Sequence, residues 1–254
     1  MLARFNMSNC APAKTLLNPS LPLLKATEND KRANPVEYRE ITGSLNHLAV
    51  FSRPDISFAV NKLSSFNSDP TVTHMKAARH VLSYLNPTRN YSITFGGARN
   101  LTPHVFSDAD WGSDPNNRTS TTGYVVMINN GPVSWTSHKQ SSVALSTMES
   151  EYMALSDASR EAIARSLLFD ELHILTGTPL LFSDNQAALT IVQHPVYHQR
   201  AKHIDIRYHF IRNAHQADQV IINYVSTTEQ LADILTKALG PQLHQRCIQA
   251  MNIR

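Results

Sequence analysis

The sequence predicts an α/β fold, in which a mixed sheet with helices packed on it follows a small all-helical unit. Three observations support this prediction. Residues 36–86 carry helical patterns only, short β-rich runs begin after Asn90, and helical segments alternate with further β-rich runs toward the C-terminus. The chain has 254 residues, of which 42% are hydrophobic, so it can form a substantial core in one large domain or two small ones.

Composition excludes several classes of protein. No apolar run approaches the roughly 20 residues of a membrane-spanning helix, and the N-terminal segment lacks the apolar region of a signal peptide. The two cysteines, Cys10 and Cys247, cannot form a disulfide framework, and no histidine cluster has zinc spacing. The net charge of +3 is only a weak indication of a polyanionic partner. We therefore expect a protein that is not secreted and has no membrane partner.

The first part of the chain is predicted to be an irregular arm followed by three helices. Residues 1–35 are rich in Pro, Asn, Lys and Ala and have no sustained period, so they form the arm. The first helix begins at Val36, Pro54 opens the second and Pro70 opens the third, which stops at Asn86. The helices have apolar stripes at Tyr38, Ile41, Leu45 and Leu48; at Ile56, Val60, Leu63 and Phe66; and at Ala77, Ala78, Val81, Leu82 and Leu85.

The later elements follow the order expected of a mixed sheet with covering helices. Four strands come first, over 91–95, 105–108, 123–128 and 133–137, with a turn at Asn129-Asn130-Gly131. Ser146 or Thr147 caps the next helix, and a capping box of Thr227 and Gln230 opens a later one. The remaining elements are a helix over 148–174, a strand over 180–184, a short helix to 192, a helical pattern over 199–215, a strand over 220–225, and helices over 229–239 and 242–251.

Four acidic residues recur in settings that can bring separate segments to one point. Asp108 and Asp184 each follow an apolar strand-like run, so adjacent strands would place both at one edge of the sheet. Glu151 and Asp233 lie in the first turns of helices that are entered from strands. Converging carboxylates repel one another unless a cation lies between them, and oxygen ligands favour Mg²⁺ or Mn²⁺. Two such ions, about 3.5–4 Å apart, can act on a phosphodiester.

Each acid has an ordinary alternative explanation. A single acid at the end of a strand is more often a helix cap or turn residue than a ligand. Asp110 and Asp114 compete with Asp108, and of Asp108 and Asp110 we expect only one to face the site. Glu149 competes with Glu151, which we prefer because the apolar residues that follow it at helical spacing are expected to be buried.

Six segments form an ordered set of motifs: YREITGSLNHLAVFSRPDISFAVNKLSSF, SDADWGSDPNNRTSTTGYV, STMESEYMAL, SDNQAAL, AKHIDIRYHFIR and EQLADILTKAL. In this order they resemble the C-terminal part of copia-type retrotransposon polyproteins, from the end of the reverse transcriptase through its ribonuclease H domain. The resemblance implies a ribonuclease H-like, five-stranded mixed sheet flanked by helices over residues 98–245. It also implies that residues 36–97 are a thumb- or connection-like helical segment of the reverse transcriptase.

The resemblance further implies an activity, which is hydrolysis of the RNA strand of an RNA–DNA hybrid with two Mg²⁺ ions, or with Mn²⁺ in their place. The family's catalytic and metal-binding acids fall on Asp108, Glu151, Asp184 and Asp233. The implied partners are the hybrid and the polymerase portion of the same polyprotein. The implied locations are the cytoplasm, including virus-like particles, and the nucleus.

Two departures from the family pattern bear on function. No Asp-Asp dipeptide occurs, so the paired aspartates of a polymerase palm are absent and we do not expect DNA synthesis. Cellular ribonucleases H carry a histidine-bearing loop before their last helix, whereas the corresponding connection here, Ser226-Thr227-Thr228, has no histidine. An alternative function is therefore a catalytically inactive, nucleic-acid-binding remnant of a reverse transcriptase. A third is cleavage of DNA by the same fold.

Two polar segments are candidates for binding nucleic acid. Arg200 and Arg207 share one face of the expected helix and Lys202 lies between them in the sequence, so these side chains can meet phosphates. The alternative is an ordinary solvated helix face. Asn116 and Arg118 precede a predicted hairpin and can reach a minor groove, where 2′-hydroxyls identify RNA. A plain polar loop is the alternative for this pair.

Overall fold

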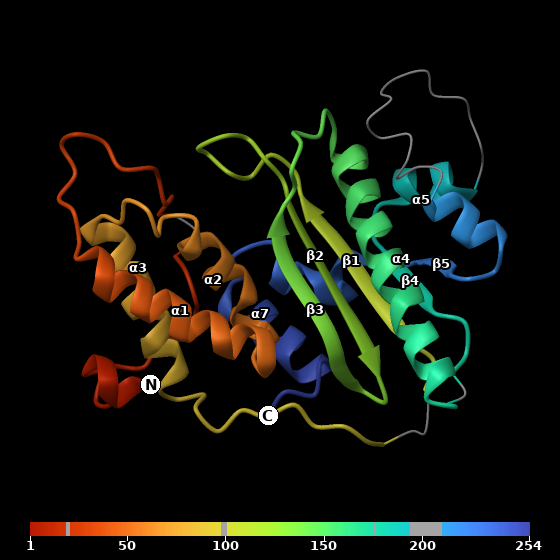
Figure 1. Ribbon diagram of the computed structural model, residues 1–254, viewed down its shortest axis with the longest axis horizontal. Helices are drawn as coiled ribbons and strands as arrows, with labels where there is room; N and C mark the ends of the chain where they lie inside the picture. Colours follow the sequence, from red (N-terminus) through yellow and green to blue (C-terminus); the bar gives the residue numbers. More distant parts are fainter. Residues whose placement is uncertain (19–20, 98–100, 175, 194–209) are drawn as a thin grey trace.

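The structure, a computed structural model, describes residues 1–18, 21–97, 101–174, 176–193 and 210–254 (Figure 1). Within these ranges the chain forms a five-stranded sheet in the order β3-β2-β1-β4-β5. The strands are β1 His104–Asp110, β2 Thr121–Ile128, β3 Gly131–Lys139, β4 Leu180–Ser183 and β5 Ile221–Tyr224. β2 is antiparallel to both β1 and β3, whereas β4 runs parallel to both β1 and β5. The predicted mixed sheet is therefore confirmed.

Helices cover both faces of the sheet, and the buried apolar residues of the described chain form a core on each face. Successive residues of a strand point to opposite faces, so Val125 packs in one core and Val126 in the other. Helices α4 (Thr147–Glu171) and α5 (Gln186–Gln193) lie over the face that includes Val126. Because both faces of β2 are covered, its residues are buried almost without interruption instead of at every second position.

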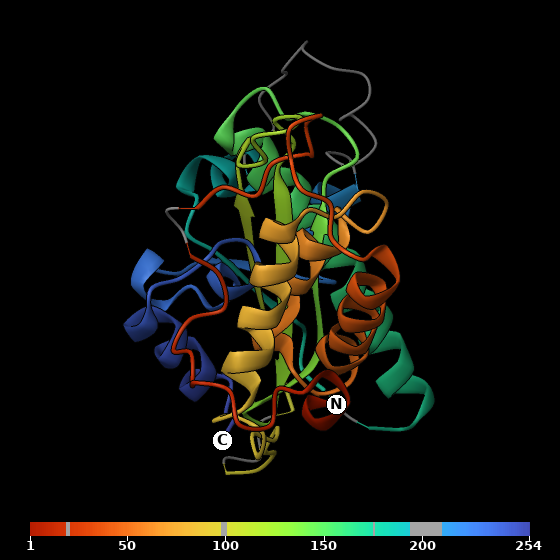
Figure 2. The ribbon, with the colours of Figure 1, turned by 90° about the vertical axis from the view of Figure 1, so that its left-hand side faces the viewer.

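The three predicted N-terminal helices are confirmed and lie over the opposite face (Figure 2). They are α1 Pro35–Phe51, α2 Ser57–Ser64 and α3 Val72–Leu85, with a short 3₁₀ turn, η2 Pro54–Ile56, before α2. Their apolar stripes pack in the same core as Val125 and Met127 of β2. The Trp135 indole of β3 also donates a hydrogen bond to the Ala49 carbonyl of α1 (2.7 Å). The helical unit and the sheet thus share one core, and the division at residue 97 stays a prediction.

The strand predicted over 91–95 is wrong. This segment makes a single bridge, between Ile93 and Ile253, and does not join the sheet. Ser92 and Arg254 exchange two backbone hydrogen bonds, so the segment pairs with the end of the chain. A β-rich run shows a tendency to extend, but local pattern does not identify its partner.

The helix predicted over 229–239 is also wrong. Two 3₁₀ turns stand in its place, η3 Thr227–Glu229 and η4 Leu231–Leu235. The predicted capping box does not form, because the Thr227 hydroxyl donates to Asp184 and the Gln230 side chain caps η4 and donates to the Ser107 carbonyl. These tertiary contacts replace the local ones that a capping box needs.

The remaining elements agree with the sequence pattern. Ser146 caps α4 by accepting from the Glu149 backbone N–H, and α7 spans Pro241–Ala250. Asn129 and Asn130 both adopt left-handed backbone conformations in the predicted β2–β3 turn. Of the pattern over 199–215, residues 210–216 are helical and the rest lies outside the described residues. None of the described helices is both long enough and apolar enough to span a membrane.

Candidate metal centre

Three of the four predicted acids converge near the carboxyl ends of the central strands β1 and β4. Asp108 lies in β1, Asp184 directly follows β4, and Glu151 lies in the second turn of α4. Because β1 and β4 are parallel neighbours, their carboxyl ends lie side by side. One carboxylate oxygen from each of the three residues lies within 4.8 Å of the others. Asn185 rather than Asp184 caps α5, so the Asp184 carboxylate is not used as a helix cap.

Glu151 carries the strongest electrostatic signal in this cluster. It is buried, it accepts a hydrogen bond from the Ala109 backbone N–H, and its second oxygen, Oε2, has no partner among the described residues. Burial, followed by the charges of Asp108 and Asp184, raises its pKa well above the usual value. A divalent cation among these oxygens would reduce the repulsion between the carboxylates and give Glu151 Oε2 a partner. The donor set therefore fits Mg²⁺ or Mn²⁺.

Asp233, the fourth predicted acid, lies in η4 and is not part of the three-carboxylate cluster. Burial and the charge of Asp108 raise the pKa of Asp233 to about 6, although Lys237 opposes this shift. The Lys237 ammonium lies 2.9 Å from an Asp233 carboxylate oxygen and 3.5 Å from one of Asp108. Lys237 therefore connects Asp233 to the cluster.

Sequence reasoning missed Lys237 and two hydroxyl groups that orient the acids. The Thr236 hydroxyl donates to Asp108, and the Thr227 hydroxyl donates to Asp184 (2.7 Å). The signal available for Lys237 was its position four residues after Asp233, the spacing of an ion pair on one helical face. No sequence signal distinguishes the two threonines, because their partners come from distant strands.

Two of the acids that compete with Asp108 and Glu151, namely Asp110 and Glu149, differ in what they contact. The expectation that only one of Asp108 and Asp110 faces the site is wrong, because residues two apart on a strand share a face. Burial raises the pKa of Asp110, and this carboxyl interacts electrostatically with Lys237 and Asp108. Glu149 accepts a hydrogen bond from the Leu145 backbone N–H, so it stabilises the start of α4.

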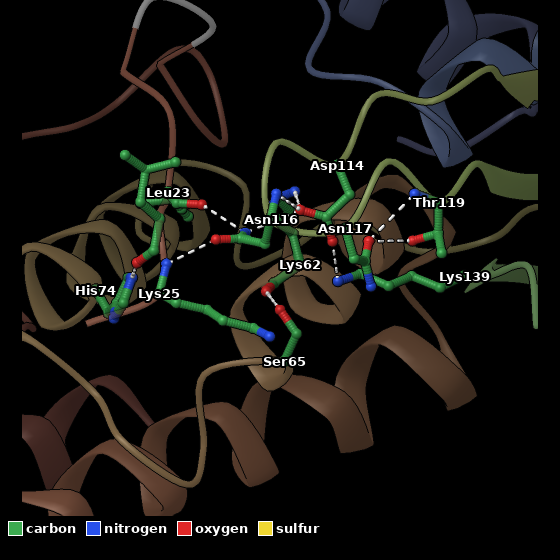
Figure 3. Close-up of polar contacts among 11 residues, drawn as sticks. Leu23, Lys25, Lys62, Ser65, His74, Asp114, Asn116, Asn117, Thr119 and Lys139 are labelled. Atoms are coloured by element: carbon green, nitrogen blue, oxygen red, sulfur yellow. Dashed lines mark hydrogen bonds and ion pairs between the residues drawn. The ribbon is translucent and has the colours of Figure 1, made fainter. Parts of the chain in front are cut away.

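Asn116, a predicted nucleic-acid contact, joins the N-terminal arm to the loop after β1 (Figure 3). Its side-chain oxygen accepts from the Lys25 backbone N–H (2.7 Å), and its amide donates to the Leu23 carbonyl and to Asp114. Arg118 is exposed and has a left-handed backbone conformation. The nucleic-acid roles of both residues stay predictions. The other three predicted contacts, Arg200, Lys202 and Arg207, lie outside the described residues.

Asp114 is buried in the same loop and pairs with Lys62 (3.3 Å) and Lys139 (Figure 3). Burial acts to raise its pKa, but hydrogen bonds from Lys139 and Asn116 and the charge of Lys62 hold it well below the usual value. Asp114→Asn is therefore expected to cost about 2–3 kcal/mol of stability at pH 7. Because the folded pKa is lowered, this contribution is full above about pH 4 and declines as the pH falls from there through the folded-state pKa.

Urea unfolding of wild type and Asp114→Asn at pH 7 and pH 3 tests this prediction. The difference between the two proteins should be largest at pH 7 and smaller at pH 3. Glu28→Gln is the control, because Glu28 is exposed. A difference that persists unchanged at pH 3 would contradict the ionic origin of the effect.

Gly123 allows η4 to approach Asp108. It is the register partner of Asp108, and a Cβ at this position would lie 2.7 Å from Leu235 Cβ and 2.7 Å from Thr236 Cγ2. Gly123→Ala should displace η4, cost about 1–3 kcal/mol and weaken Mn²⁺ binding. Thermal unfolding and Mn²⁺ titration measure both effects. Gly43→Ala in α1, where a Cβ meets nothing within 4 Å, should leave Mn²⁺ binding unchanged and leave stability unchanged or slightly higher. Equal effects of the two substitutions would contradict the close approach of η4 to Gly123.

Comparison with known proteins finds similarity to retrotransposon polyproteins. The chain is 44% identical over 241 residues to the retrovirus-related Pol polyprotein from transposon RE1 of Arabidopsis thaliana, covering 94% of this chain and 16% of that polyprotein. It is 36% identical over 252 residues to the corresponding polyprotein from transposon TNT 1-94 of Nicotiana tabacum, covering 97% of this chain and 19% of that one. The chain thus spans less than a fifth of the length of these relatives. No protein-family model matches it.

A solved structure of similar arrangement is LC11-RNase H1 in complex with an RNA/DNA hybrid. It has 14% sequence identity and a TM-score of 0.41, and the match covers 53% of this chain and 94% of that one. At this low score, the strand order and the parallel and antiparallel pairings described above, rather than the superposition, identify the fold of the sheet.

Proposed function

Because this chain belongs to the family of copia-type retrotransposon Pol polyproteins and has a ribonuclease H-like fold, we propose that it hydrolyses the RNA strand of RNA–DNA hybrids. One observation carries the proposal, namely the convergence of Asp108, Glu151 and Asp184 at the edge shared by β1 and β4. Segments far apart in the sequence supply these acids, and a purely structural role would not require three carboxylates to face one another.

The chain's own residues provide the arrangement that such hydrolysis needs. We propose that Asp108, Glu151 and Asp184 hold one Mg²⁺ ion and that Asp108 and Asp233 hold a second, with Mn²⁺ as a substitute. The ions would supply positive charge to the phosphodiester and lower the pKa of the attacking water. The Thr236 and Thr227 hydroxyls hold Asp108 and Asp184 in place, and burial keeps bulk water from Glu151.

The test is cleavage of a labelled RNA–DNA hybrid by purified protein with Mg²⁺, beside Asp184→Asn. Wild type should cut the RNA strand and Asp184→Asn should not. Equal signals, or none from wild type, would refute the proposal. Hybrid binding without cleavage would favour the inactive remnant, and cleavage of a DNA duplex at an equal rate would favour the DNA-cleaving alternative.

Partners and location are also proposed from the family. The hybrid and the polymerase portion of the same polyprotein are the proposed partners, with residues 36–97 as the thumb- or connection-like segment. The cytoplasm, including virus-like particles, or the nucleus is the proposed location. An interaction with a separately expressed polymerase portion in a pull-down would support the first part of this proposal, and its absence would count against it.

A further inference from the structure

The carboxylate centre has two halves that differ in charge balance. In one half, Asp108, Glu151 and Asp184 face one another and Glu151 Oε2 has no partner among the described residues. In the other half, the Lys237 ammonium lies between Asp108 and Asp233, at 3.5 Å and 2.9 Å. Lys237 thus forms ion pairs with Asp108 and Asp233, whereas no ion pair to Glu151 or Asp184 is found among the described residues.

The backbone holds Lys237 in this position. Its N–H donates to the Asp233 carbonyl (3.1 Å), and η4 lies close against Gly123 beside Asp108. The ammonium thus occupies the space between Asp108 and Asp233. A divalent ion placed between these two carboxylates would collide with the ammonium and be repelled by its charge.

Lys237 also has room to move away. Its side chain is 37% exposed and lines a groove with Asp110, Thr121 and Lys62. An anionic group that approaches the carboxylates through this groove would attract the ammonium. A phosphodiester is such a group, and it is the substrate class of the proposed function.

We propose that Lys237 holds the position of the second divalent ion in the substrate-free protein, so that the centre binds one ion until a phosphodiester draws the ammonium away. The proposal rests on the proposed function for the identity of the substrate. Its first part, one ion in the absence of substrate, concerns the protein alone. Lys237 then acts as a positioning residue that couples binding of the second ion to binding of substrate.

The test counts Mn²⁺ ions bound to the substrate-free protein, by calorimetry and by electron paramagnetic resonance of free Mn²⁺. Wild type should bind one ion, whereas Lys237→Gln should bind two, because the charge that occupies the second position is gone. Lys237→Arg, which retains the charge, should bind one. Lys76→Gln, which removes an exposed charge from the same groove, should also bind one. Circular dichroism checks that each variant is folded.

Two ions on wild type, one ion on Lys237→Gln, or none on either protein would overturn the proposal. These outcomes do not depend on cleavage. If wild type binds one ion and Lys237→Gln binds two but neither cuts a hybrid, the proposed function fails while the ion-site inference stands. If wild type cuts a hybrid yet binds two ions without it, the inference fails while the proposed function stands.

Discussion

Glu151→Gln is expected to abolish hybrid cleavage while making the ion-free protein more stable. The buried Glu151 carboxyl has a raised pKa and an oxygen without a partner, so ionisation in the folded state is costly. Glutamine keeps an oxygen to accept from the Ala109 N–H but removes the charge. The gain in stability should be about 1–3 kcal/mol at pH 7.5, and the loss of cleavage at least about 1,000-fold.

The sign of the pH dependence follows from the raised pKa. Below about pH 4 the carboxyl is protonated in both folded and unfolded protein, so wild type and Glu151→Gln should have similar stability. Above the unfolded pKa, the unfolded carboxyl ionises freely, whereas the folded one either keeps its proton or ionises at a cost in free energy. The stability of wild type should therefore fall below that of Glu151→Gln as the pH rises. Urea unfolding with a chelator at pH 4 and pH 7.5 measures this divergence.

Divalent ions should reverse the order of stability. Mg²⁺ or Mn²⁺ binds the folded wild type and raises its stability, whereas Glu151→Gln should gain little. Glu149→Gln is the matched control on the same helix, because Glu149 stabilises the helix start through Leu145 and lies outside the cluster. It should lose stability slightly and keep its response to ions. Equal stabilisation of wild type and Glu151→Gln by Mn²⁺ would remove Glu151 from the metal centre.

Asp55→Ala is expected to destabilise the whole chain by about 3–5 kcal/mol, because it leaves a buried arginine charge without its partner. Asp55 is fully buried and accepts two hydrogen bonds from the Arg53 guanidinium, at 2.8 and 2.7 Å. The Tyr84 hydroxyl of α3 also donates to the Asp55 carboxylate (2.8 Å), and His244 of α7 lies against the Asp55 carbonyl. Arg53, Asp55 and their partners therefore connect the helical unit with the C-terminal helix.

The loss should occur in one cooperative transition. The N-terminal helices, α7 and one face of the sheet share a core, so opening the Arg53–Asp55 pair should affect all of them. Urea unfolding followed by circular dichroism and by tryptophan fluorescence should give coincident midpoints, both lower in Asp55→Ala. Asp69→Ala is the control, since the Arg32–Asp69 pair is exposed and should contribute at most about 1 kcal/mol. Equal losses in the two variants would contradict the role of burial.

Local pattern predicted most of the helices and strands because each had a strong internal signal. Pro54 and Pro70 mark the beginnings of helical segments, and Tyr38, Ile41 and Leu45 repeat at the spacing of a buried helical face. The pattern failed where partners are distant in the sequence. Residues 91–95 pair with the chain end, and Thr227 bonds to Asp184 instead of capping a helix.

The acids of the candidate metal centre could be read from motifs, since Asp108, Glu151 and Asp184 each stand in a recognisable segment and do converge. The charge balance of the centre could not be read in this way. Thr236 meets Asp108 across 128 positions of sequence, and Lys237 reaches the same carboxylate because Gly123 lets η4 lie against β2. Periodicity and polarity determine local structure over a few residues and can be read directly from the sequence. Contacts between a lysine and a distant carboxylate depend on strand order and close packing, which exist only once the sheet has formed.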